Sequence, residues 1–158
     1  MARAILNRRL SFRSRAAPNI IVEFNHIIIP AADKRAAAHF LARVLGLKTT
    51  YGPGEQIRLQ TGHGLTLDFA DFSSALALQC AFMVTESEFD AVLVRLRSEA
   101  IDYFASFDGE GRGQINRRHG GRGIYFDGPD RHLFELIEQT DTSAPKGRIK
   151  ALAIKYAY

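Results

Sequence analysis

The sequence predicts an α+β protein made of two units with the same order of elements: strand, helix and three further strands (β-α-β-β-β). Two observations support this. A predicted strand followed by an amphipathic helix occurs twice, and short strands separated by turns follow each helix. We place the first unit at about 22–72 and the second at about 76–139. A chain of 158 residues can bury a substantial core, so we expect one domain over 22–139.

The first unit opens with the run EFNHIIIP at 23–30, which predicts a strand that ends at a proline. A helix is predicted over 31–46, because apolar residues recur at i, i+4 spacing and Gly46 stands where a helix would end. Gly-Pro-Gly and Gly-His-Gly turns then divide 48–71 into short strands.

The second unit repeats this order. The run LQCAFMV at 78–84 predicts a strand, and 85–101 predicts a helix that begins with a capping box of Thr85 and Glu88. The remaining strands are predicted at 102–108, 123–127 and 132–139, with a Gly- and Arg-rich loop before the second of them.

The net charge of +4 is concentrated at the two ends of the chain. Residues 1–20 and 142–158 hold nine of the 21 basic residues and no acidic ones, which leaves 12 basic against 17 acidic residues in between, a net −5. Nucleic-acid binding needs a basic body, so we exclude it. No apolar run approaches the about 18 residues of a membrane span, and we expect no membrane partner.

The ends of the chain and the single cysteine bear on location. Residues 1–20 are rich in arginine, as in an organellar transit segment, but we favour a disordered extension or a start codon placed too early. The extension 140–158 ends in an apolar stretch suited to an added strand or to an arm on a partner subunit. Cys80 alone excludes an internal disulfide and fits a reducing compartment, so we expect a cytoplasmic protein.

Superimposing the two units places His26 opposite Gln79, in their first strands, and Asp68 opposite Glu135, in their last strands. Strand alternation puts Asp68 on the face opposite its apolar neighbours. A carboxylate inside an apolar strand, such as Glu135, is costly to bury unless it is paired or bound to a metal. These four positions therefore predict a shared polar surface.

Residues 22–139 resemble the vicinal oxygen chelate superfamily, which includes glyoxalase I, fosfomycin- and bleomycin-resistance proteins and extradiol dioxygenases. The resemblance rests on NHIIIP, FLARVLGL, LTLDFAD, AFMVTESEFDAVLVRLR and, most closely, GRGIYFDGPDRHLFELIEQ. It implies two β-α-β-β-β modules that form a cupped mixed β-sheet with flanking helices, around a cleft that holds a divalent metal.

The resemblance also implies the site residues. His26 matches the first metal ligand and Glu135 the third, while Gln79 stands where the family usually has a second histidine. Asp68 falls near a fourth, carboxylate ligand, and with Glu135 it is a candidate catalytic group. This mixed donor set suits Zn, Ni, Mn, Co or Fe. The alternatives are a core role for His26, a solvated strand position for Asp68, and a site at Gln79 that has lost its metal.

Five basic residues lie in the loop before the last two strands: Arg112, Arg117, Arg118, His119 and Arg122. We expect Arg118 and Arg122 to bind a carboxylate or phosphonate group of a substrate. Tyr125 is a further candidate for substrate binding. The alternatives are a solvated loop and a core aromatic residue.

These features predict a glyoxalase-like enzyme that depends on a divalent metal and acts on a small oxygen-bearing substrate as a lyase, isomerase or transferase. The alternative is a metal-free protein of the bleomycin-resistance type that sequesters a drug or metabolite. Ring cleavage by a dioxygenase ranks third, because it uses two histidines and Gln79 replaces one of them. The resemblance also implies a homodimer.

Overall fold

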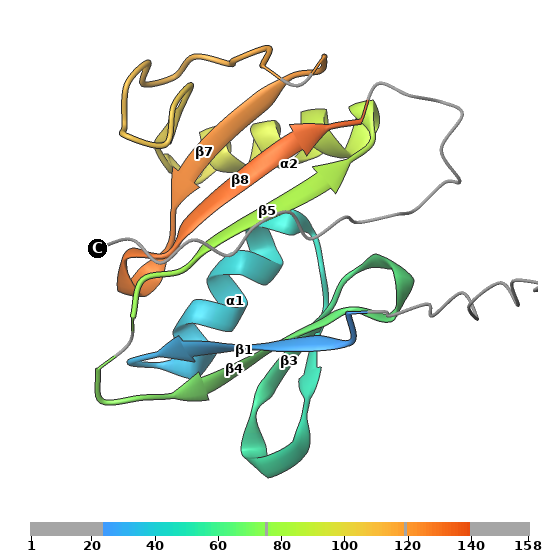
Figure 1. Cartoon of the computed structure of the whole chain (residues 1–158), viewed down its shortest axis with the longest axis vertical. Coiled ribbons are helices and arrows are strands. Elements are labelled where there is room, and N and C mark those ends of the chain that lie inside the picture. The colour runs from blue at the N-terminus through green and yellow to red at the C-terminus, as the bar shows by residue number, and fades with distance from the viewer. Residues whose placement is uncertain (1–23, 75, 119, 140–158) are drawn as a thin grey trace, which may run out of the picture.

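The computed structural model describes residues 24–74, 76–118 and 120–139 of the chain. Within them, strand, helix and three strands follow one another twice, so the prediction of an α+β fold with two β-α-β-β-β modules is confirmed (Figure 1). The predicted extensions 1–20 and 140–158 lie outside the described residues. Neither helix in the described part of the chain has the length and hydropathy needed to cross a membrane.

The first module begins with a strand and a helix whose ends are set by local chemistry. The Asp33 carboxylate accepts hydrogen bonds from the backbone N–H groups of Arg35 and Ala36, which caps the helix start. Gly46 ends the helix with a φ of 73°, in the region that favours glycine, as predicted. The elements are β1 (His26–Ala31), α1 (Lys34–Leu45), β2 (Thr49–Tyr51), η1 (Pro53–Glu55), β3 (Ile57–Gln60), η2 (Gly62–Gly64) and β4 (Thr66–Asp71).

The second module repeats this plan, and its helix starts with the predicted capping box. The Thr85 hydroxyl accepts from the Glu88 N–H, and the Glu88 carboxylate accepts from the Thr85 N–H at 2.8 Å. The elements are β5 (Gln79–Val84), α2 (Glu86–Ser98), β6 (Tyr103–Phe104), β7 (Gly123–Asp127), η3 (Pro129–Arg131) and β8 (Leu133–Glu138).

The strand predicted over 102–108 is shorter than expected, since β6 has only two residues. The Ala105 N–H donates to the carbonyl groups of Glu110 and Gly111 within the same loop, instead of to a neighbouring strand. Glycines with positive φ, Gly111 among them, allow the tight turns that follow.

The two sheets have matching strand orders, β1-β4-β3-β2 and β5-β8-β7-β6, with the first strand of each module at an edge. Asp68 pairs with the third residue of β1, and Glu135 pairs with the third residue of β5. His26 and Gln79 are the first residues of those two strands. The equivalence predicted from the two halves of the sequence is therefore confirmed.

One hydrophobic core joins the two modules, and α1 lies between the two sheets (Figure 1). The core takes alternate side chains from both sheets, such as Phe69 of β4 and Phe134 of β8, together with the buried faces of α1 and α2. Because successive strand residues point to opposite faces, Asp68 and Glu135 lie on the sides that the helices do not cover. We call these sides the outer faces. They are directed away from the shared core and not toward each other.

A buried histidine connects the modules where they meet. His132 is 1% exposed, and its Nε2–H donates to the Pro30 carbonyl of β1 at 2.8 Å. The backbone N–H of Leu78 donates to Nδ1 of the same ring at 3.1 Å. An acceptor on one nitrogen and a donor on the other select the neutral tautomer with hydrogen on Nε2.

We expect His132→Ala to lower the free energy of unfolding by about 2–4 kcal/mol, because it leaves two buried backbone groups unpaired and opens a cavity. The matched control is His39→Ala, since His39 is exposed on α1 and should change stability by less than about 0.5 kcal/mol. Denaturant titration measures both. Equal effects of the two substitutions would contradict a bridging role for His132.

Candidate functional site

The outer face of the second sheet carries a buried acid and a tyrosine in contact. Glu135 is 8% exposed on β8, and Tyr125 stands opposite it on β7. The Tyr125 hydroxyl donates a hydrogen bond of 2.7 Å to Glu135 Oε1. Burial, followed by this bond and the charge of Glu135, raises the pKa of Tyr125 to about 12. The hydroxyl is therefore a permanent hydrogen-bond donor to Glu135 at neutral pH.

Arg118 lies near this pair, at the exposed rim of the same region. Its guanidinium reaches the Ser106 hydroxyl at 3.4 Å, and its backbone N–H donates to the Asn116 side chain. Its positive charge offsets part of the increase in the pKa of the Tyr125 hydroxyl. The substrate-binding role of Arg118 stays a prediction.

Two neighbouring residues of β5 point to opposite sides of the second sheet. Gln79 shares the outer face with Glu135 and is half-buried. Cys80 packs against the core, and burial raises the pKa of its thiol to about 11.

The outer face of the first sheet carries an ion pair. Asp68 is 1% exposed, and Arg58 of β3 donates to both of its oxygens, from Nε at 2.7 Å and from Nη2 at 2.6 Å. These bonds hold the pKa of Asp68 below its ordinary value, and His26 acts in the same direction. The alternative that Asp68 is a solvated strand residue is wrong.

His26 lies exposed at the start of β1, on the same face as Asp68. Its Nδ1 is 3.0 Å from Oδ1 of Asn25. An amide oxygen can only accept, so Nδ1 is the donor of this bond, and in the neutral ring the lone pair lies on Nε2. The alternative that His26 is a core histidine is wrong, because the residue is exposed, and its role as a metal ligand stays a prediction.

Asp68 and Glu135 occupy equivalent positions but have different partners. Arg58 on β3 stands where Tyr125 stands on β7. Arg58 uses both oxygens of its acid, whereas Tyr125 donates a single hydrogen bond. Sequence reasoning missed Arg58, although it alternates with two core residues of β3 and so had to lie on the face of Asp68.

The predicted metal ligands are divided between the two sheets. His26 and Asp68 lie on the outer face of the first sheet, and Gln79 and Glu135 lie on that of the second. Among the described residues of one chain, no three His, Cys, Asp or Glu side chains come together in a group that could hold a metal ion. A single chain therefore does not assemble the expected set.

Arg122 lies on the helix side of the second sheet, away from Glu135. Its guanidinium donates to Glu138 at 2.8 Å and to Asp90 of α2 at 2.6 Å. It also packs over the Phe89 ring, 4.5 Å from the ring centroid. These contacts link α2 to β8 through Arg122. The expectation that Arg122 faces a substrate is therefore corrected.

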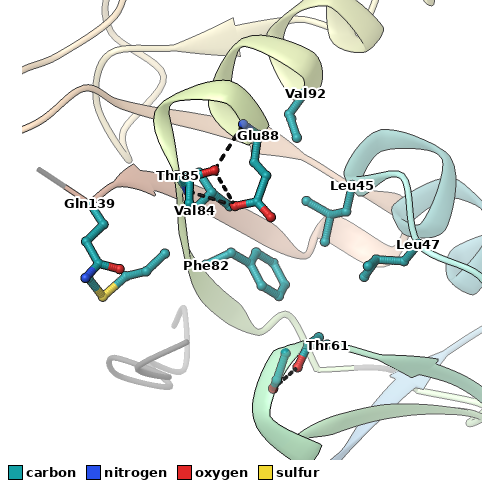
Figure 2. Close-up of a pocket in the computed structure, with 11 residues that line it drawn as sticks. Leu45, Leu47, Thr61, Phe82, Val84, Thr85, Glu88, Val92 and Gln139 are labelled. Atoms are coloured by element: carbon teal, nitrogen blue, oxygen red, sulfur yellow. Dashed lines mark hydrogen bonds between the residues drawn. The ribbon is translucent and has the colours of Figure 1, made fainter. Parts of the chain in front are cut away.

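A cavity of about 180 Å³ lies between the modules on the helix side (Figure 2). Leu45 and Leu47 line it from the end of α1, and Phe82 lines it from β5. Glu88 also borders it, but its carboxylate is held by Thr85 in the capping box. None of the predicted site residues lines this cavity, so it is separate from the outer faces.

The chain is similar to several solved structures. "Oxidase ChaP-H2" is 35% identical with a TM-score of 0.72, and the match covers 80% of this chain and 100% of that one. "Oxidase ChaP-H1" is 37% identical with a TM-score of 0.72 and coverage of 75% and 97%. The fosfomycin resistance protein FosX from Listeria monocytogenes shares the fold, at 21% identity, a TM-score of 0.57 and coverage of 78% and 96%. No family model and no curated protein matches the chain.

We expect Asp68→Asn to change how stability depends on pH. Because Arg58 lowers the pKa of Asp68 below its ordinary 3.8, the ion pair contributes its full stability above that value. This contribution is lost as the pH falls through the lowered pKa. The difference in unfolding free energy between parent and variant should stay constant from about pH 8 to about pH 5 and shrink below about pH 4. Urea titrations at each pH measure it, and a difference that shrinks near neutrality would contradict the assignment.

Proposed function

The chain belongs to the vicinal oxygen chelate superfamily as a glyoxalase-like protein, and from this premise we propose that it is a metal-dependent oxidase of a small oxygen-bearing substrate. The observation that carries the proposal is its identity of 35% and 37% to two oxidases, over 100% and 97% of their lengths. The sequence alone favoured lyase, isomerase or transferase chemistry, and these relatives lead us to rank oxidation first.

We propose His26, Gln79 and Glu135 as the ligands of a divalent metal. The donor chemistry fits: His26 offers Nε2, because Nδ1 donates to Asn25. Glu135 supplies an anionic oxygen, and Gln79 supplies a neutral amide oxygen. This set accommodates Zn, Ni, Mn, Co or Fe, and oxidation favours Fe or Mn among them.

Asp68 has a different part in this proposal. Both of its oxygens accept hydrogen bonds from Arg58, so a metal would have to displace the guanidinium. We therefore leave Asp68 out of the ligand set and treat it as the partner of Arg58. Glu135 remains the candidate general base.

When bound, the metal would supply a Lewis acid and, as Fe or Mn, a redox centre. Tyr125 holds Glu135 in one orientation through the bond to Oε1. With a pKa of about 12, its hydroxyl keeps donating while Glu135 takes a proton from a substrate hydroxyl. Arg118, at the rim, suits a substrate that carries negative charge.

The proposed site needs a second copy of the chain, because the two outer faces point away from the shared core. We propose that the outer face of the first sheet in one copy packs beside that of the second sheet in the other. This arrangement would form the cup that the resemblance implies. The edge strands β1 and β5, which begin with His26 and Gln79, would then lie at the junction.

A metal-free binding protein is the second candidate, and Gln79 is the observation that favours it. An amide oxygen is neutral and a poorer donor than imidazole toward the later first-row metals. A protein of this kind would use the same outer faces to hold a small molecule without changing it.

The shared site predicts that the protein is a dimer and that mixed dimers of two inactive variants regain part of the metal binding. The parent protein should have a mass of about 35 kDa by light scattering at micromolar concentration, twice the 17.6 kDa of one chain. His26→Ala and Glu135→Ala should each abolish tight metal binding. After the two variants are unfolded and refolded together in equal amounts, about a quarter of the sites should bind metal again, because one site in each mixed dimer is intact. No recovery, or a monomeric mass, would contradict the shared site.

Gln79→His should tighten binding of Zn, Ni and Mn by about one to two orders of magnitude, roughly 1.4–2.8 kcal/mol. Imidazole replaces a weaker donor at nearly the same reach. Adding Glu135→Ala to this variant should remove the gain, since the anionic ligand is lost. Titration calorimetry measures each affinity.

The same proteins test the oxidation. Parent protein loaded with Fe(II) should consume dioxygen with at least one of a panel of catechols and hydroxy ketones, and Glu135→Ala should not. If neither the parent nor Gln79→His binds metal, the metal-free binding protein becomes the better assignment.

A further inference from the structure

Arg58 presents a fixed guanidinium on the outer face of the first sheet. Its side chain is 31% exposed, whereas the Asp68 side chain beneath it is 2% exposed. Asp68 binds one side of the guanidinium, formed by Nε and Nη2, at 2.7 and 2.6 Å. The buried acid therefore sets the direction of the exposed cation.

The opposite edge of the guanidinium is available to a ligand. Nη1 has no hydrogen-bond partner among the described residues, and Nη2 has a second N–H. The bonds to Asp68 raise the pKa of Arg58, so it stays charged. A planar pair of N–H groups of this kind matches the two oxygens of a carboxylate.

The residues around Arg58 form a polar surface. Thr50 pairs with Arg58 across β2 and β3, and Gln60 and Thr66 lie in the next row of the same face. His26 pairs with Thr66 on β1, which places the proposed metal ligand one row away from Arg58. Arg58 and His26 thus lie on the same face of the first sheet, with β4 between their strands.

Stability alone does not explain the pair. Replacing a buried ion pair by apolar residues of similar size is often neutral or stabilising. The equivalent positions of the second module hold Tyr125 and Glu135, so the fold does not require an arginine here. The Arg58–Asp68 pair provides an oriented guanidinium at the protein surface, and an oriented charged group of this kind is typical of binding sites.

We propose that Arg58 is a substrate-binding residue that accepts a carboxylate group, and that Asp68 is the residue that positions it. The inference rests on the proposed function in one respect, namely that the bound carboxylic acid is the molecule that the protein oxidises. It narrows the proposed substrates to small carboxylic acids. Because Asp68 already balances the charge of Arg58, the subsite contributes orientation and selectivity more than affinity.

The test uses full-length protein treated with chelator, so that metal binding has no influence. Benzoate is the probe, and benzamide is the neutral ligand of the same shape. Titrations followed by NMR should show saturable benzoate binding by the parent, at least tenfold tighter than benzamide. In Arg58→Gln/Asp68→Asn, an uncharged pair that keeps a hydrogen bond and avoids a lone buried acid, this preference should fall to less than twofold.

Arg43→Gln is the matched control, because Arg43 pairs with Glu99 at 3.2 Å on an exposed surface. It should keep the parent's preference. Asp68→Asn alone should change the preference at least threefold while Arg58 remains, because it removes both the charge that balances the guanidinium and the bonds that orient it. A purely structural role of Asp68 would leave the preference unchanged in a variant of native circular dichroism. The proposal is overturned if the parent shows no saturable binding or no preference, or if the double variant keeps the preference.

Metal titrations of the double variant separate this inference from the proposed function. His26, Gln79 and Glu135 are unchanged in it, so its metal affinity should stay within about threefold of the parent's. If the parent binds benzoate selectively but binds no metal, Arg58 still marks a carboxylate site and the oxidase assignment fails. If metal binds and the preference for benzoate is absent, the oxidase assignment stands and the Arg58 subsite is wrong.

Discussion

Each strand of this protein can give only every second side chain to the hydrophobic core, and the two modules share one core. That constraint directs Phe69, Phe134 and their neighbours inward around α1 and α2. The same constraint places Asp68 and Glu135 on the outer faces, and the two outer faces point away from each other. The buried His132 connects the two modules through hydrogen bonds with Pro30 of β1 and with Leu78, which precedes β5. The division of the proposed site between two sheets, and hence between two copies, follows from this packing.

The two modules carry acids at equivalent positions, and the neighbours of these acids differ. Arg58 holds the first acid with two charged hydrogen bonds and lowers its pKa. Tyr125 gives the second acid one neutral hydrogen bond. A carboxylate bound on both oxygens by a guanidinium is suited to orienting that guanidinium. Glu135 accepts from the neutral hydroxyl of Tyr125 instead, and it is the acid that we propose as a metal ligand and base.

The loop before β7 shows that a cluster of charges in sequence need not act as one group in space. Arg118 remains at the rim near Tyr125, where its charge reaches the hydroxyl. Arg122, four residues later, crosses to the helix side and binds Glu138 and Asp90. The difference arises because Arg122 directly precedes β7, where the chain passes between Glu138 and α2.

The sequence by itself determined the features that depend on local chemistry and on strand and helix periodicity. Caps at Gly46 and Thr85 defined the helix ends, and repetition of the pattern identified both modules and the equivalence of Asp68 with Glu135. Only the tertiary structure decided which partner each acid meets and which way each outer face points. A partner of Asp68 comes from a neighbouring strand whose register the local sequence does not encode. The direction of the faces depends on both helices packing into one shared core.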